Sequence, residues 1–174
     1  MFTRLRYRTQ QFFAGLSAYV DEDEQRQVRQ QLSPAAAQLF FDMPRDGQRH
    51  SLNVYRALQE EGHYHSALLA AALLHDCGKA AARFNIFSRS VLVLADALFR
   101  SALAELASDD PDSGWRYVTY VYLYHPEIGA TWAAEAGCSP LCAWLIEHHQ
   151  AQDASGTEQE RSLLAALQAA DNAN

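Results

Sequence analysis

Apolar residues recur at helical spacing along most of the chain, and short polar turns separate the apolar stretches. In the segment 88–107 they stand three or four positions apart, at Val91, Leu94, Leu98, Ala102 and Leu106. Such spacing places the apolar side chains on one face of a helix. The pattern predicts helices over residues 2–20, 22–32, 34–41, 48–61, 64–76, 88–107, 126–136, 140–150 and 157–171.

Turn residues predict where several of these helices begin. The pairs Ser33-Pro34 and Ser139-Pro140 each place proline after a residue that caps helix N-termini well. Residues 44–47 begin with proline and end with glycine, so we expect a loop there.

Composition favours an all-α fold in a single domain. Ala and Leu together number 51 of the 174 residues, whereas Val, Ile and Thr number 15. Residues 115–124 are rich in aromatic residues and Val, so composition alone would also allow a strand. We expect a helix there, because the flanking segments are helical and no partner strand is evident. A separate helix is expected to begin at Pro126.

The net charge, the apolar runs and the cysteines restrict the expected function and the expected cellular compartment. A net charge of −7 argues against non-specific nucleic-acid binding, which needs a basic surface. No apolar run approaches the ~20 residues of a membrane span. Cys77, Cys138 and Cys142 are too few and too unevenly spaced for a disulfide framework. We therefore expect a cytoplasmic protein without a membrane anchor; its oligomeric state stays open.

Histidines and aspartates fall on the apolar faces of the expected helices. Five of the seven histidines and two aspartates do so: His50, His75, Asp76, His125, His148, His149 and Asp171. The other two, His63 and His65, are expected in a solvated loop. A buried carboxylate is costly unless it is paired or binds a metal, and few cationic residues lie near Asp76 and Asp171 in the sequence. Imidazoles and carboxylates together favour Fe, Mn, Zn or Co.

This ordered set resembles the metal site of the HD-domain superfamily of metal-dependent phosphohydrolases. The segment LLHDCGK, with His75, Asp76 and Lys79, is similar to the central signature of that superfamily. The segments HPEIGA and EHHQ resemble the extended site of HD-GYP-type members. However, Gln150 follows the histidine pair and no Gly-Tyr-Pro element occurs, so we expect cyclic di-GMP to be a poor substrate.

The resemblance implies an HD-type helical domain over residues 42–174, preceded by an N-terminal helical extension over residues 1–41. It implies two divalent transition-metal ions, Fe or Mn above all, with Zn, Co or Ni as alternatives. The first ion would be held by His50, His75, Asp76 and Asp171. Asp76 would bridge to a second ion held by His125 and His148. His149 would be a further ligand, a supporting residue or a substrate contact.

The resemblance also implies hydrolysis of a nucleotide or another small phosphoester. The metal ions would generate a hydroxide that attacks phosphorus, with Asp76 as the bridging ligand and Lys79 contacting the phosphate or the leaving oxygen. Some relatives bind a third metal through a carboxylate four residues before the first histidine. Asp46 has that position here, but a plain turn residue is the simpler interpretation.

Two other classes of function use the same residues. Some HD-fold proteins are di-iron oxygenases, and Lys79 does not distinguish these from hydrolases. A non-catalytic module that senses a nucleotide is the third alternative. No residue of the ligand set that the resemblance implies is replaced, which favours an enzyme; this set is His50, His75, Asp76, His125, His148 and Asp171.

Overall fold

The structure is a computed structural model that describes residues 20–83 and 86–174. Every regular element within these two ranges is helical, which confirms the predicted all-α fold. The elements are α2 (Glu22–Gln31), α3 (Pro34–Asp42), α4 (Arg45–Glu60), α5 (Ser66–Leu74), η1 (Cys77–Ala81), α6 (Ile86–Leu106), η2 (Pro111–Ser113), α7 (Trp115–Glu135), α8 (Pro140–His148) and α9 (Glu158–Ala173). The helix expected over residues 2–20 lies outside the described residues, apart from Val20.

Both predicted Ser-Pro helix starts are confirmed. The Ser33 hydroxyl oxygen accepts a hydrogen bond from the Ala36 amide at the start of α3, at 3.2 Å. The Ser139 hydroxyl oxygen accepts one from the Cys142 amide at the start of α8, also at 3.2 Å. These bonds satisfy amide groups that have no partner within the helix.

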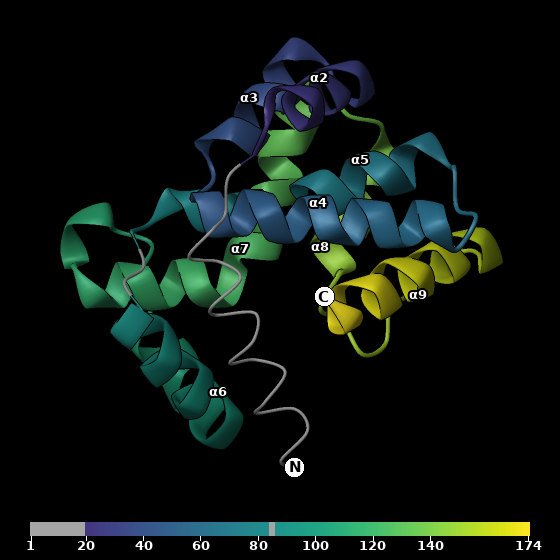
Figure 1. The fold of residues 1–174 in the computed structure, drawn as a ribbon. Helices are drawn as coiled ribbons and strands as arrows, with labels where there is room; N and C mark the ends of the chain where they lie inside the picture. Colours follow the sequence, from purple (N-terminus) through teal and green to yellow (C-terminus); the bar gives the residue numbers. More distant parts are fainter. Residues whose placement is uncertain (1–19, 84–85) are drawn as a thin grey trace.

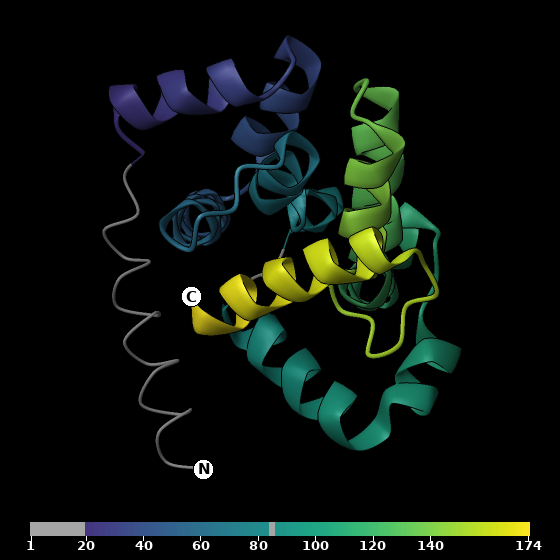
Figure 2. The same ribbon diagram turned by 90° about the vertical axis from the view of Figure 1, so that its right-hand side faces the viewer.

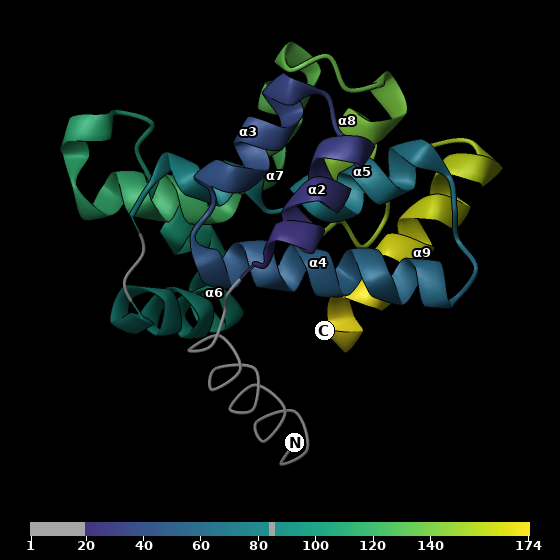
Figure 3. The ribbon, with the colours of Figure 1, turned by 45° about the horizontal axis from the view of Figure 1, so that its top comes forward.

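Helix α5 lies at the centre of the hydrophobic core. Its sequence is apolar on every side, and such a helix is stable in water only when other elements enclose it. Helices α2, α3, α4, α8 and α9 all contact it, and α2 lies across it in Figure 3. The core is continuous from Val28 in α2 to Ala170 in α9. Figure 1 shows how the helices that contribute to it are arranged. The described part of the 1–41 segment therefore shares one core with the rest of the chain.

Helix α7 is longer than predicted, because it runs through Pro126 without a break. The prediction of a new helix at Pro126 was wrong. Proline has no N–H to donate to the carbonyl of Tyr122, four residues earlier. That carbonyl instead accepts a hydrogen bond from Nδ1 of His125, at 2.9 Å. The side chain thus replaces the missing backbone bond, and the proline lies within the helix.

The loop expected over residues 44–47 was also wrong, because α4 already begins at Arg45. Pro44 occupies the cap position with a backbone that leads into the helix. Gly47 lies in the first turn, where a glycine is tolerated. Asp46 is therefore a residue of the first turn of α4, one helical turn before His50.

Helix α6 packs on α7 and extends away from the central helices (Figure 2). Its backbone is non-helical at Phe99, where the helix kinks, so the predicted helix over 88–107 is present with a kink. A small second cluster of Leu92, Leu103 and Leu123 joins the two helices. Of the helices that the structure describes, none is both long enough and apolar enough to cross a membrane.

Candidate metal centre

Side chains from five helical segments converge beside the C-terminal end of α5. The convergence brings together His50 of α4, His75 and Asp76 after α5, His125 of α7, His149 after α8 and Asp171 of α9. They form two groups, each of which could hold a metal ion: His50, His75 and Asp171 in the first, and Asp76, His125 and His149 in the second. Within each group the candidate ligand atoms all lie within 4.8 Å of one another.

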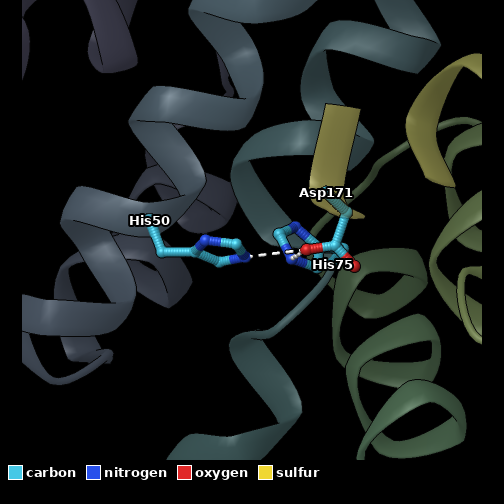
Figure 4. Close-up of side chains that lie close together, drawn as sticks. All are labelled: His50, His75 and Asp171. Atoms are coloured by element: carbon cyan, nitrogen blue, oxygen red, sulfur yellow. Dashed lines mark hydrogen bonds and ion pairs between the residues drawn. The ribbon is translucent and has the colours of Figure 1, made fainter. Parts of the chain in front are cut away.

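The first group is held between α4, α5 and α9 (Figure 4). Nε2 of His50 lies 2.8 Å from Oδ1 of Asp171, and Nε2 of His75 lies 3.6 Å from the same oxygen. His75 is almost completely buried, whereas the side chains of His50 and Asp171 are each 27% exposed. The first group is therefore open to solvent on the side of α4 and α9.

The second group is more deeply buried. Oδ1 of Asp76 lies 3.5 Å from Nε2 of His125 and 3.7 Å from Nε2 of His149. Both imidazoles are buried. Close packing of η1 on α7 brings these residues together, because Gly78 lies directly against the backbone of His125.

Asp76 belongs to the second group and also faces the first. Its Oδ1 faces His125 and His149, while its Oδ2 lies 3.8 Å from Nε2 of His75. Oδ2 also accepts a hydrogen bond from Nζ of Lys79 at 2.7 Å. A carboxylate with one oxygen toward each group has the arrangement that a bridging ligand needs.

The backbone orients three of the histidines in the same way. Nδ1 of His75 lies 3.0 Å from the carbonyl oxygen of Ala72, and Nδ1 of His149 lies 2.7 Å from that of Ile146. His125 makes the equivalent contact with Tyr122. A carbonyl oxygen only accepts, so Nδ1 carries the hydrogen in each ring and a neutral ring keeps its lone pair on Nε2. Metal-binding histidines are commonly held this way.

Two of these Nε2 atoms are buried without a hydrogen-bond partner, namely those of His75 and His149. A buried polar atom left unpaired costs about 1–3 kcal/mol, so native proteins rarely leave one without a role. Both atoms face carboxylates of the two groups. Their donor type, their burial and their direction fit a bound metal ion.

The charges of the two carboxylates also fit a cation site. Burial raises the pKa of Asp76, but Lys79 and His75 outweigh that effect and hold the pKa well below its ordinary value. Burial also raises the pKa of Asp171, but the effects of His50 and His75 are larger and bring that pKa far below its usual range. Both side chains therefore remain ionised in the structure, and one buried and one partly buried negative charge favour a cation between them.

The histidines differ in protonation. Burial lowers the pKa of His149 to about 3, so this ring is neutral near pH 7. Burial also lowers the pKa of His75, but Asp76 and Asp171 outweigh it and raise that pKa above its ordinary value. In the absence of a metal ion, a proton on His75 would partly neutralise the two carboxylates.

The structure differs from the expected ligand set at the histidine pair. His148 belongs to neither group; its ring stacks on Trp144 and its Nδ1 lies 2.9 Å from the Trp144 carbonyl oxygen. His149 takes the place expected for His148. His65 is exposed and His63 half-buried in the turn after α4, and neither belongs to either group.

Two contacts were not foreseen from the sequence. Lys79 is a close cationic partner of Asp76, although we had expected few such partners. The side-chain amide nitrogen of Gln150, the residue after the histidine pair, lies 3.3 Å from Nε2 of His125. The only sequence signal for Gln150 was its position directly after His149.

Comparisons with protein-family models, with curated proteins and with solved structures find no match for this chain.

Proposed function

We propose that this protein is a metal-dependent phosphohydrolase with two divalent transition-metal ions, one at each group. The observation that carries the proposal is the pair of buried, unpartnered Nε2 atoms of His75 and His149, which face two ionised carboxylates. Asp76, with one oxygen toward each group, would bridge the ions. The resemblance of the HDCGK segment, and of the histidines in the HPEIGA and EHHQ segments, to the HD-domain superfamily supports the same function.

The donor set favours certain metals. Each group combines imidazole nitrogen with carboxylate oxygen and contains no thiolate. Such mixed donors suit Fe and Mn, and Zn, Co or Ni also bind them. The three cysteines are free thiols, which agrees with the proposed cytoplasmic location, where thiols stay reduced.

The proposed reaction is hydrolysis of a phosphate ester. When bound, the metal ions would acidify a water molecule and neutralise charge on the phosphate oxygens. The half-exposed side of the site, formed by His50, Asp171 and Lys79, is where a substrate would enter. Lys79 holds its ammonium beside Asp76 and would bind a phosphate oxygen there. The buried rings of His75 and His149, whose Nε2 atoms have no other partner, would exclude water from the interior side.

The first experiment is metal analysis of protein purified without added metal, followed by assays with nucleotides and simple phosphate mono- and diesters. About two ions per chain and turnover of at least one ester are expected. Asp76→Ala should abolish both metal binding and turnover, because it removes the bridging carboxylate. His63→Ala is the matched control and should change neither.

Two outcomes would contradict the proposal. Protein that takes up no transition metal, even when it is supplied, would overturn the site. Metal-loaded protein that oxidises a substrate with dioxygen but hydrolyses no ester would replace the hydrolase with an oxygenase.

A further inference from the structure

Gln150 covers the ligand nitrogen of His125 in this structure. Because Nδ1 of His125 is bound to the Tyr122 carbonyl, the lone pair of a neutral ring is on Nε2. The side-chain amide of Gln150 lies 3.3 Å from that nitrogen and donates to it. Among the three inward rings of His75, His125 and His149, only the Nε2 of His125 has a hydrogen-bond partner.

The same lone pair is required by the second metal ion, so this inference rests on the proposed function. Zinc, for example, binds an imidazole nitrogen at about 2.0–2.1 Å, and one lone pair cannot serve both the metal and the amide. The Gln150 amide must therefore leave Nε2 when a second ion binds. Gln150 is exposed and lies in the turn after α8, so its side chain has room to move aside.

The backbone of this turn keeps Gln150 close to the site. The amide of Ala151 donates to the carbonyl of His148 at 2.9 Å, and the Gln168 side chain donates to the carbonyl of Ala151 at 2.8 Å. Once displaced, the exposed Gln150 amide has lost its acceptor, but the turn keeps it next to His125. Because Gln150 is exposed, its displaced amide can donate to water or to an oxygen of a phosphate bound at the metal ions.

We propose that Gln150 has two successive roles: it competes with the second metal ion for His125, and it then donates a hydrogen bond to a phosphoryl oxygen of the substrate. The two roles predict opposite effects of one substitution. Loss of the amide should strengthen binding of the second ion and weaken binding of phosphate.

The test uses the full chain after chelator treatment, titrated with Mn²⁺ and followed by calorimetry. For Gln150→Ala, the second ion should bind between about twofold and tenfold more tightly than in the wild type, the range that one lost hydrogen bond implies. In the manganese-loaded protein, inorganic phosphate should bind more weakly by a similar factor. Gln152→Ala, an exposed glutamine two residues further along, should change neither.

The outcomes separate this inference from the proposed function. Wild-type protein that binds no Mn²⁺ would overturn both. Wild-type protein that binds two ions, with unchanged or weaker second binding in Gln150→Ala, would overturn only the role of Gln150 as a competitor. Tighter metal binding with unchanged phosphate affinity would overturn the substrate contact. A merely structural role for Gln150 would weaken metal binding, so it cannot mimic the expected result.

Discussion

Gly78→Ala is expected to destabilise the protein and to weaken metal binding, because η1 and α7 leave no room for a methyl group. A Cβ atom at this position would lie 2.1 Å from the carbonyl oxygen of His125 and 2.7 Å from the amide nitrogen of Gly129. Both atoms belong to the backbone of α7, so neither can turn aside as a flexible side chain would.

The size of the effect follows from these distances. Ordinary van der Waals contact of a Cβ atom begins at about 3.4 Å, so η1 and α7 must separate by about 1.3 Å. Inserting one methyl group into a closely packed interior costs about 1–3 kcal/mol, and the rigid surroundings place Gly78→Ala near 3 kcal/mol. The same displacement moves Oδ1 of Asp76 away from its position 3.5 Å from Nε2 of His125. We therefore expect the second metal ion to bind at least about tenfold more weakly.

Gly47→Ala is the matched control. Gly47 lies in the first turn of α4, and a Cβ atom there would meet only Cβ of Met43, at 3.8 Å. Alanine favours the helix over glycine, so this variant should gain about 0.5 kcal/mol. Urea unfolding of the two variants should therefore give midpoints that move in opposite directions, and a Mn²⁺ titration should show a loss only for Gly78→Ala.

Equal midpoints for the two variants would refute the reasoning, since they would show that η1 and α7 do not pack as closely as described. A destabilised Gly78→Ala protein that still binds two ions with wild-type affinity would refute the link between this contact and the second group.

Three further predictions concern the metal ligands, the bound ions and the core. His125→Ala and His149→Ala should each lower the metal content from about two ions to about one, measured by elemental analysis, while His148→Ala should leave it unchanged. Removing the metal with a chelator should lower the melting temperature, because the ions bind the folded chain, and added Mn²⁺ should restore it; an unchanged melting temperature would contradict structural coupling of the site. Glu24→Gln should cost at most about 3 kcal/mol at pH 7, because hydrogen bonds from Arg49, set against the penalty of burial, lower the pKa of Glu24 from 4.5 to about 2. Because the folded-state pKa is lowered, the ionised carboxylate stabilises the fold fully above pH 4.5, and this stabilisation is lost as the pH falls toward 2. In urea unfolding, wild type and Glu24→Gln should therefore converge below pH 4.5. Glu22→Gln, at an exposed position, should match the wild type throughout.

The helices and the candidate ligands could largely be predicted from the sequence. Apolar spacing depends only on the period of a helix, and the caps at Ser33 and Ser139 act within one turn. Both are local properties, so they do not depend on how the rest of the chain packs. For the same reason, the sequence could place His75, His125 and Asp171 on inward helix faces.

The tertiary structure decided what depends on contacts between helices. His148 and His149 are neighbours at the end of α8 and point in different directions, so only the packing of α8 against α5 and α7 determines which one joins the second group. The continuity of α7 through Pro126 is by contrast a local effect, because the His125 ring donates to the carbonyl of Tyr122 three residues earlier in the same helix.

The sequence by itself determined that this chain folds into helices and carries histidines and aspartates on buried faces, because the hydrophobic period and the helix caps are encoded over a few residues. Only the tertiary structure decided that Asp76 directs one oxygen toward each group, that Lys79 lies beside it and that Gln150 reaches His125. Asp76 and Gln150 contact histidines from other helices, and the Asp76–Lys79 contact depends on how the chain turns after α5. The orientation of a side chain in such contacts is set by the packing of whole helices, which no local pattern specifies.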